Sequence, residues 1–316
     1  MKYMDMHCDT MGLFYMERDK EEKTNFYEND KTHISLKKLI EGDCLVQFFA
    51  HFDMFPMTNY DFDNMKNYIS HTKNLLSQYP DEIKIITSMN EIDPDKVNAL
   101  LTIEDSGSMN GSLENIKTVY DMGIRVMGFT WNFENSLGFP QSTDPEAMAK
   151  GLKPFGFEAV EYMNELGIGI DVSHLSDGGF YDIAKTTKKP FFATHSNSRT
   201  VTNHTRNLTD DMIKVLADKG GVTGINFCPP FLSENEKANF IADMVKHIDY
   251  IVNVGGIDVM GLGSDFDGIS GELELKGADE MGKLALALNK AGYSDDKIEK
   301  IFSKNVERAM REILGE

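Results

Sequence analysis

Short apolar segments recur along the whole chain and alternate with longer segments of helical periodicity. Eight of them have the length and composition of buried parallel strands. These runs are Tyr3–His7, Cys44–Phe49, Ala99–Glu104, Ile124–Trp131, Ile168–His174, Phe191–His195, Val222–Phe227 and Val259–Asp265. The segments between them carry helix boundary signals: Ser112 and Thr209 as N-caps, Pro154 in a first turn and Gly220 as a stop.

Eight strand-and-helix units in 316 residues predict a (β/α)₈ TIM-like barrel. Residues 1–316 are expected to form one domain, because no Pro/Gly/Ser-rich linker or internal repeat divides the chain. An open doubly wound sheet is the structural alternative. A last amphipathic helix, beginning near Ser294, is expected to complete the outer layer.

The charge balance and the cysteines exclude several classes of protein. With 32 basic and 51 acidic residues the formal net charge is −19, and such a field repels nucleic acid and anionic membrane surfaces. Cys8, Cys44 and Cys228 lie far apart without a CxxC pair, so neither a disulfide framework nor a cysteine zinc site is expected. The N-terminal residues lack the apolar core of a signal peptide, and no run of 18 apolar residues occurs. We therefore expect a cytoplasmic protein.

The predicted strands end in polar residues. Because the βα loops of a barrel converge on one face, such residues are expected to meet there. In chain order they are His7 and Asp9, Gln47, Glu104, Trp131 and Asn132, His174, His195, Asn226, and Asp265 with Asp267. Each one alone has an ordinary explanation as a hydrogen-bonded rim residue, but their repetition favours a functional site.

Five of these residues have the chemistry of metal ligands. His7 and Asp9 are two residues apart in a strand and therefore point to the same face. Glu104 ends the apolar run LLTIE, where an ionised carboxylate needs a cation or, alternatively, a salt bridge at the rim. His174 and His195 add two nitrogen ligands. Five ligands match two metal ions that share a carboxylate and use a bridging hydroxide as nucleophile.

Three further residues are candidates for catalysis and substrate binding. Asp265, at the end of the eighth strand, is placed to act as a general acid and base, or alternatively as a helix N-cap. Arg199 and Arg206 follow His195, and either is a candidate clamp for a substrate carboxylate or an ordinary surface ion pair.

Other motifs and histidines are not assigned to the site. The segment GSDFDG lacks the spacing of a calcium loop, and GSMNGS lacks the Lys-Ser/Thr end of a P-loop. His33, His51, His204 and His247 are expected in helices or loops outside the site.

Taken together, these motifs make the chain resemble the membrane dipeptidase family, also called the renal dipeptidase family, and in particular its soluble bacterial members. The resemblance extends from Asp5 to the last helix. The matching segments are DMHCDT, TIEDSG, GLKPFGFEAVEYMNELGIGIDVSHLS, THSNSR and GLGSDFDG. It implies a distorted barrel, a binuclear zinc site and hydrolysis of dipeptides, including those with a C-terminal D-residue. It also implies a homodimer.

The resemblance implies a role for each matching residue. His7 and Asp9 would bind one zinc ion, His174 and His195 the other, and Glu104 would bridge the two. The candidate catalytic residues are then Asp265 and Glu104, and the candidate substrate-binding residues are Arg206, Asp265, Trp131 and Asn132. Many family members have a histidine at the end of strand four that polarises the substrate carbonyl, and Trp131 takes its place here. Asn132 is a candidate hydrogen-bond donor in its stead.

Two other functions fit the same residues. The first is a different binuclear amidohydrolase acting on a cyclic amide or lactone, although such enzymes usually begin with HxH instead of HxD. The second is a catalytically silent relative that binds a peptide or a metal, which the missing strand-four histidine would suggest.

Overall fold

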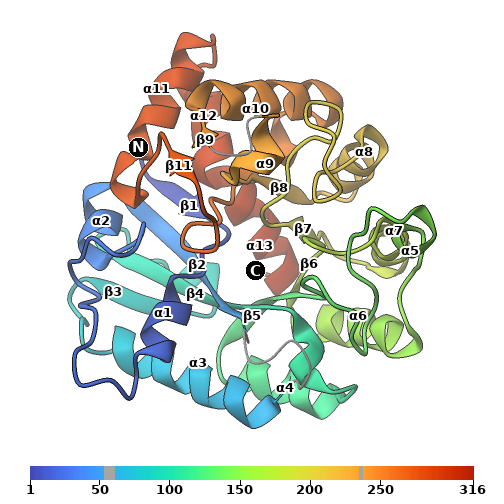
Figure 1. The fold of residues 1–316 in the computed structure, drawn as a ribbon, viewed down its shortest axis with the longest axis horizontal. Coiled ribbons are helices and arrows are strands. Elements are labelled where there is room, and N and C mark those ends of the chain that lie inside the picture. Colours follow the sequence, from blue (N-terminus) through green and yellow to red (C-terminus); the bar gives the residue numbers. More distant parts are fainter. Residues whose placement is uncertain (53–60, 235–237) are drawn as a thin grey trace.

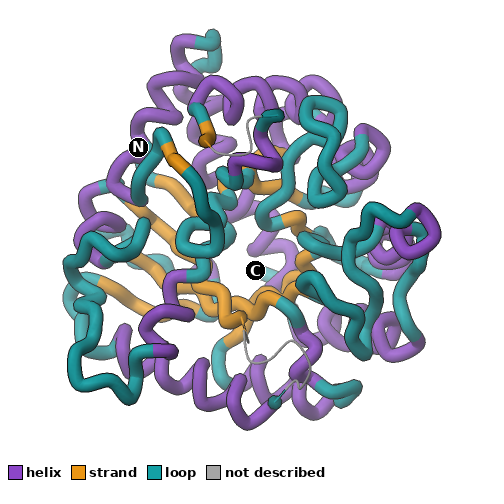
Figure 2. Tube along the Cα trace, viewed as in Figure 1, coloured by secondary structure: helices purple, strands orange, loops and turns teal. Residues whose placement is uncertain are grey.

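Eight parallel strands close into a barrel in the computed structural model, which describes residues 1–52, 61–234 and 238–316. The order around the barrel is β1-β2-β4-β5-β6-β7-β8-β10, and the β1–β10 pairing completes the ring (Figures 1 and 2). The strands are β1 (Tyr3–Asp5), β2 (Cys44–Phe52), β4 (Val97–Glu104), β5 (Ile124–Gly128), β6 (Gly169–Asp171), β7 (Phe192–Ala193), β8 (Val222–Ile225) and β10 (Met260–Leu262). The predicted TIM-like barrel is confirmed, and each predicted run overlaps one of its strands.

The barrel is irregular. β7 has only two residues in the ladder, and the register shifts between Tyr3 and Met4 and between Leu101 and Thr102. Most strands leave the ladder two or three residues before the end of the predicted run, so several polar residues expected at strand ends lie just beyond them. β2 differs in the opposite direction, because it continues to Phe52.

In the described part of the chain, three short strands lie outside the ring. β3 (Ile83–Ile86) pairs with the first half of β4, on the edge that β5 uses further along, and the sequence reading missed it. β9 (Ala238–Asn239) and β11 (Glu272–Leu273) form a separate parallel pair.

Helices surround the barrel and connect its strands (Figure 2). They are α1 (Thr10–Met16), α2 (Leu36–Glu41), α3 (Phe62–Leu76), α4 (Leu113–Asp121), α5 (Pro145–Met148), α6 (Pro154–Leu166), α7 (Asp177–Thr186), α8 (Asp210–Asp218), α9 (Pro229–Leu232), α10 (Ile241–Gly255), α11 (Gly282–Lys290), α12 (Asp295–Glu299) and α13 (Asn305–Leu314). The predicted caps are confirmed at Ser112 and Thr209, whose side chains accept hydrogen bonds from the N–H groups of Asn115 and Met212. Among the described residues, no helix is both long and apolar enough to cross a membrane.

The last helix closes the amino-terminal end of the barrel instead of completing the outer layer as expected. Val306, Met310 and Ile313 of α13 are buried in one apolar cluster with inward-facing strand residues, among them Val126 and Phe192. Figure 1 shows α13 behind the centre of the barrel, with the C-terminus beside it. This arrangement leaves the carboxyl ends of the strands as the open face, where a TIM barrel places its site.

Two residues in β2 are buried in places that the sequence did not predict, whereas His247 lies in a helix outside the site as expected. Gln47 lies beside Asp5 inside the barrel and not at the strand's end, and its amide donates to Oδ2 of Asp5 at 3.1 Å. His51 lies in β2, not in a helix or loop, and is fully buried between the carbonyl of Thr102 and the hydroxyl of Thr72. His247 of α10 is also fully buried.

Candidate metal centre

Five side chains with oxygen or nitrogen ligand atoms meet at the carboxyl ends of β1, β4, β6 and β7. They are His7, Asp9, Glu104, His174 and His195. The first two follow β1, Glu104 is the last residue of β4, and the other two histidines follow β6 and β7. All are buried except Asp9, whose side chain is 16% exposed.

Glu104 lies between two pairs of these side chains. Its Oε2 atom is 3.6 Å from Nε2 of His7, which is itself 3.4 Å from Oδ2 of Asp9. Its Oε1 atom is 3.0 Å from Nε2 of His174 and 3.8 Å from Nε2 of His195. The two carboxylate oxygens therefore face different pairs, an arrangement that allows one carboxylate to bridge two cations.

The residues present fit a metal ion. The Nε2 atoms of His7 and His195 are buried and have no hydrogen-bond partner among the described residues, which costs free energy that a bound ligand would recover. Within the described ranges, two groups of side chains have ligand atoms within 4.8 Å of one another; they are His7, Glu104 and His195, and His7, Asp9 and Asp265. Imidazole nitrogens and carboxylate oxygens are the donors of zinc sites in proteins.

Thr194 fixes the tautomer of His195. Its hydroxyl lies 2.6 Å from Oδ2 of Asp171 and 2.8 Å from Nδ1 of His195. Because an ionised carboxylate can only accept, the hydroxyl donates its proton to Asp171 and accepts the N–H of His195. The lone pair of His195 is then on Nε2, the atom that faces Glu104.

Asn132 acts in the same way on His174. Its Oδ1 atom is 3.1 Å from Nδ1 of the imidazole, and an amide oxygen can only accept, so Nε2 again keeps the lone pair. His174 also has a φ of 67°, a left-handed conformation that is strained for a residue with a side chain. Its carbonyl accepts the N–H of Gln141 at 2.7 Å, which helps to hold this conformation.

The charges divide the site into an acidic part and a neutral part. Burial, followed by the charge of Asp9, raises the pKa of Glu104 to about 8. Burial lowers the pKa of His7, but Asp9 and Glu104 outweigh it and raise that pKa well above the ordinary value. For His174 and His195, burial lowers the pKa well below the ordinary value, and Arg206 lowers both further. The two histidines are thus neutral, the form that binds a metal.

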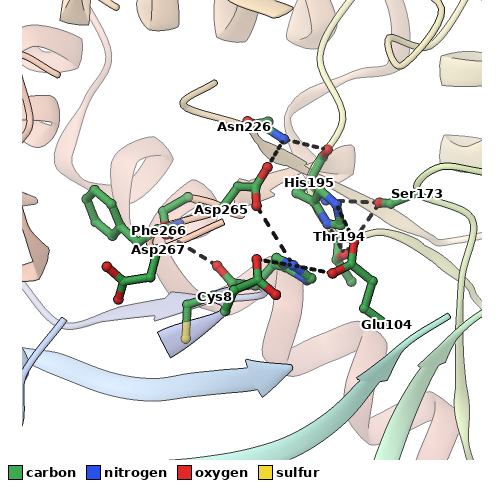
Figure 3. A network of polar contacts seen from close by, with 12 residues as sticks. Cys8, Glu104, Ser173, Thr194, His195, Asn226, Asp265, Phe266 and Asp267 are labelled. Carbon is green, nitrogen blue, oxygen red and sulfur yellow. Dashed lines mark hydrogen bonds and ion pairs between the residues drawn. The ribbon is translucent and has the colours of Figure 1, made fainter. Parts of the chain in front are cut away.

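Asp265 faces His7 from the end of β10. Its Oδ1 atom is 3.9 Å from Nε2 of His7, and its Oδ2 atom accepts a hydrogen bond of 2.9 Å from the amide of Asn226. Figure 3 shows Asn226 between this carboxylate and the backbone of His195, whose carbonyl it also contacts at 3.1 Å. Burial raises the pKa of Asp265 to about 7. Its φ of 62° and the absence of a helix directly after it exclude the alternative role as an N-cap.

The two arginines after β7 have different surroundings. Arg199 is paired with Asp177, whereas Arg206 is only 5% exposed and makes two long contacts of 3.4 Å, to Oγ of Ser196 and to the carbonyl of His195. Its Nε atom has no partner among the described residues. Of the two candidate clamps, Arg206 therefore retains hydrogen-bonding capacity for an anion.

A cavity of about 660 Å³ opens above these residues. Its lining includes Asp9, Glu104, His174 and Asp265, together with the two predicted residues that follow β5, the fourth strand of the ring, Trp131 and Asn132. Its size is in the range of small-molecule sites. Cys8, between the two residues of the HxD motif, is buried away from the cavity and contacts the carbonyl of Phe48.

Several residues that support the site were not predicted. Among them are Asp171 and Thr194, which orient His195. Asp267, which was already among the polar residues expected at the open face, accepts hydrogen bonds from the backbone of His33 and the hydroxyl of Thr10. These contacts join residues up to 257 positions apart. The only sequence signal for them is their closeness to a ligand: Thr194 precedes His195 directly, and Asp171 lies three residues before His174.

Comparison with known proteins gives matches over nearly the whole chain. The family model described as membrane dipeptidase (peptidase family M19) matches residues 1–314. An uncharacterized dipeptidase of Schizosaccharomyces pombe is 30% identical and aligns with 98% of this chain and 80% of its own. An uncharacterized protein encoded in the pqqA 5′ region of Klebsiella pneumoniae is 32% identical, over 76% of this chain and 93% of its own.

Solved structures share the fold at lower identity. The dipeptidase AC, a metallopeptidase of family M19, superposes with a TM-score of 0.92 and 24% identity over 100% of this chain and 99% of its own. A metallopeptidase from Rhodobacter sphaeroides, bound to a phosphinate mimic of L-Ala-D-Ala, has a TM-score of 0.89 and 22% identity over 99% of both chains.

Proposed function

The chain belongs to the membrane dipeptidase family, peptidase family M19, and from this premise we propose a zinc-dependent dipeptidase that also accepts substrates with a C-terminal D-residue. Membership makes the protein a metallo-dipeptidase, a hydrolase acting on peptide bonds. The observation that carries the finer proposal is Glu104, whose two oxygens face two separate pairs of ligand residues.

We propose that two zinc ions are held by the five clustered side chains. His7 and Asp9 would hold one ion, His174 and His195 the other, and Glu104 would bridge them. When bound, such a pair lowers the pKa of a shared water and so supplies hydroxide near neutral pH. Thr194 and Asn132 contribute by keeping the two neutral imidazoles in the tautomer that presents Nε2.

Arg206 would bind the free carboxylate of the dipeptide. Its guanidinium is buried, stays charged under all ordinary conditions, and has an Nε atom without a partner among the described residues. A buried guanidinium with an unused N–H group binds a carboxylate strongly, because the two carboxylate oxygens can accept two parallel hydrogen bonds from it. The clamp would restrict the enzyme to short substrates, because the carboxylate must lie close to the scissile bond.

Asp265 would move the proton during hydrolysis. Its Oδ1 atom faces His7, while Asn226 holds the other oxygen and so fixes the plane of the carboxylate. From this position the carboxylate would take a proton from the attacking water and deliver it to the departing amine. The amide nitrogen of Asn132, whose oxygen is on His174, would contact the substrate from the position after β5.

The tolerance for a D-residue is proposed from family membership and from one relative. The Rhodobacter sphaeroides metallopeptidase was solved with a mimic of L-Ala-D-Ala, and the present chain shares its fold over nearly the full length. We propose the same class of substrate here, a dipeptide with a free carboxylate and either configuration at its second residue.

The proposal is tested by elemental analysis of protein purified without added metal, together with hydrolysis of L-Ala-L-Ala, L-Ala-D-Ala and Gly-D-Ala before and after chelation. About two zinc ions per chain and chelator-sensitive cleavage are expected. Glu104→Gln should lose both metal and activity, whereas Glu114→Gln, an exposed residue in the first turn of α4, should lose neither. Metal binding without cleavage of any dipeptide would overturn the proposed substrate, and failure to bind added zinc would overturn the ligand set.

A further inference from the structure

Three aromatic side chains form one wall of the cavity. The ring of Trp131 lies 4.8 Å from the ring of Phe52 and 5.8 Å from that of Phe133, measured between centroids. All three line the cavity, and Phe133 is 39% exposed. We call Phe52, Trp131 and Phe133 the aromatic wall. Binding of an apolar group against such a surface is favourable, because it displaces water from the aromatic rings.

The aromatic wall begins next to the candidate metal centre. The centroid of the Trp131 ring is 6.2 Å from that of His174, and Nε2 of His174 is 3.0 Å from Glu104. One side chain therefore separates the wall from the place where the scissile bond would lie. A substrate side chain on the Cα atom next to the scissile bond is therefore close enough to contact the aromatic wall.

The wall and the proposed carboxylate clamp arise from different strands of the ring. Phe52 ends β2, four strands away from β7 in both directions, and Trp131 and Phe133 follow β5, two strands away from β7. Arg206 is in the loop after β7. A dipeptide backbone spans only about 7 Å. With its carboxylate at Arg206 and its peptide bond at Glu104, the substrate directs its amino-terminal residue away from the clamp and toward the wall.

From this arrangement we propose that the enzyme prefers dipeptides whose first residue has a large apolar side chain, above all an aromatic one, and that Trp131 and Phe133 determine this preference. The inference rests on the proposed dipeptidase function and adds the substrate class to it. A methyl group, as in alanine, leaves most of the wall in contact with water. A phenyl group covers it and stacks on the indole ring in the offset or edge-to-face geometry that aromatic pairs favour.

The expected effect is a ratio of rates. We expect kcat/KM for L-Phe-D-Ala to exceed that for L-Ala-D-Ala by about 10- to 100-fold, and mainly through a lower KM, because the contact is the same in the ground state and the transition state. L-Ala-D-Phe, which carries the ring on the other residue, should show no such gain. Trp131→Ala and Phe133→Ala should each reduce the ratio, while Phe157→Ala, on the outer helix α6 and 38% exposed, should keep it.

A binding measurement on the unmodified, metal-loaded enzyme makes the test independent of any variant. Trp131 is the single tryptophan of the chain, so intrinsic tryptophan fluorescence reports on the wall directly. Titration with a phosphinate mimic of L-Phe-D-Ala should change this emission more strongly, and at lower concentration, than the mimic of L-Ala-D-Ala. Equal rates and equal fluorescence responses for the two series would overturn the preference while leaving the dipeptidase intact. Failure to cleave any dipeptide would instead overturn the proposed function.

Discussion

The guanidinium of Arg199 donates two hydrogen bonds to the carboxylate of Asp177, with an Nη1–Oδ2 distance of 2.7 Å and an Nη2–Oδ1 distance of 2.8 Å. The same guanidinium also donates to the carbonyls of Thr205, at 3.2 Å, and Asn207, at 2.8 Å. These two residues directly precede and follow Arg206. Arg199 therefore holds the backbone on both sides of the proposed carboxylate clamp, using an ion pair with α7 as its anchor.

Removing this support should weaken substrate binding more than it slows the chemical step. Arg199→Gln and Asp177→Asn should each raise KM for a dipeptide by about 10- to 100-fold with a smaller change in kcat, because a shift of about 1 Å in Arg206 is enough to misplace the carboxylate. Steady-state kinetics with a dipeptide and with its C-terminal amide separate the two effects, since the amide has no carboxylate to lose. Lys185→Gln, an exposed change on the same helix, is the control. An unchanged KM for the dipeptide in both variants would contradict this role.

The hydrogen-bond chain from Asp171 through Thr194 to His195 should determine metal affinity. Thr194→Val keeps the shape of the side chain but removes the hydroxyl, so His195 loses the partner that fixes its tautomer. Losses of such partners commonly cost about 10- to 100-fold in metal affinity, and we expect a loss in that range. Competition with a chelator of known affinity measures it. Thr118→Val, on the surface of α4, should bind metal like the unmodified protein, and equal affinity in Thr194→Val would exclude the orienting role.

Asp265→Asn should separate metal binding from catalysis. The amide keeps the size of the side chain but cannot carry the proton, so kcat should fall by about 10²- to 10⁴-fold while the zinc content stays the same. Kinetics and elemental analysis on the same preparation check both statements. Asp295→Asn, in the exposed first turn of α12, controls for the change of charge. A near-normal kcat would show that the proton passes through another group.

The sequence predicted the eight barrel strands and the cluster at their carboxyl ends, because a buried parallel strand is apolar throughout and a polar residue marks the point where it meets the open face. The strand ends were less accurate. His174 and Asp265 adopt left-handed backbone conformations, with φ of 67° and 62°, which take the chain out of the ladder before the apolar run is complete. Side-chain periodicity does not encode such a conformation.

Other features depend on partners that are distant in the sequence. β3 was missed because its four residues, IKII, are only partly buried and pair on one edge alone. The sequence could not show whether Arg199 binds substrate or pairs with Asp177, because the partner of an arginine side chain is determined by the tertiary fold. The amphipathic pattern of α13 predicted a helix correctly, but the same apolar stripe fits the outer layer and the end of the barrel equally well.

The position of α13 predicts a stability effect that leaves the site unaffected. Ile313 is fully buried where this helix closes the amino-terminal end of the barrel. Ile313→Ala should lower the free energy of unfolding by about 2–5 kcal/mol through lost transfer energy and a cavity, with KM unchanged because the site is at the opposite end. Urea unfolding measures the first quantity. Glu312→Ala, on the exposed side of the same helix, should change stability little, and an equal loss there would exclude the packing explanation.

His51 should make the stability of the protein depend on pH. Burial lowers its pKa from 6.5 to about 4, and the hydrogen bond with the carbonyl of Thr102, which raises the pKa, offsets only part of this effect. The unfolded chain therefore binds the proton more readily than the folded one. The stabilisation is fully present above pH 6.5 and is lost as the pH falls toward 4, at roughly 1.4 kcal/mol per pH unit.

Urea unfolding at a series of pH values measures this effect, on chelated protein so that metal release does not contribute. The plot of unfolding free energy against pH should have a shallower slope for His51→Gln than for the unmodified chain. His71→Gln, a partly exposed position on α3, should change the slope less, and an identical slope for His51→Gln would show that the buried imidazole is not the group that titrates.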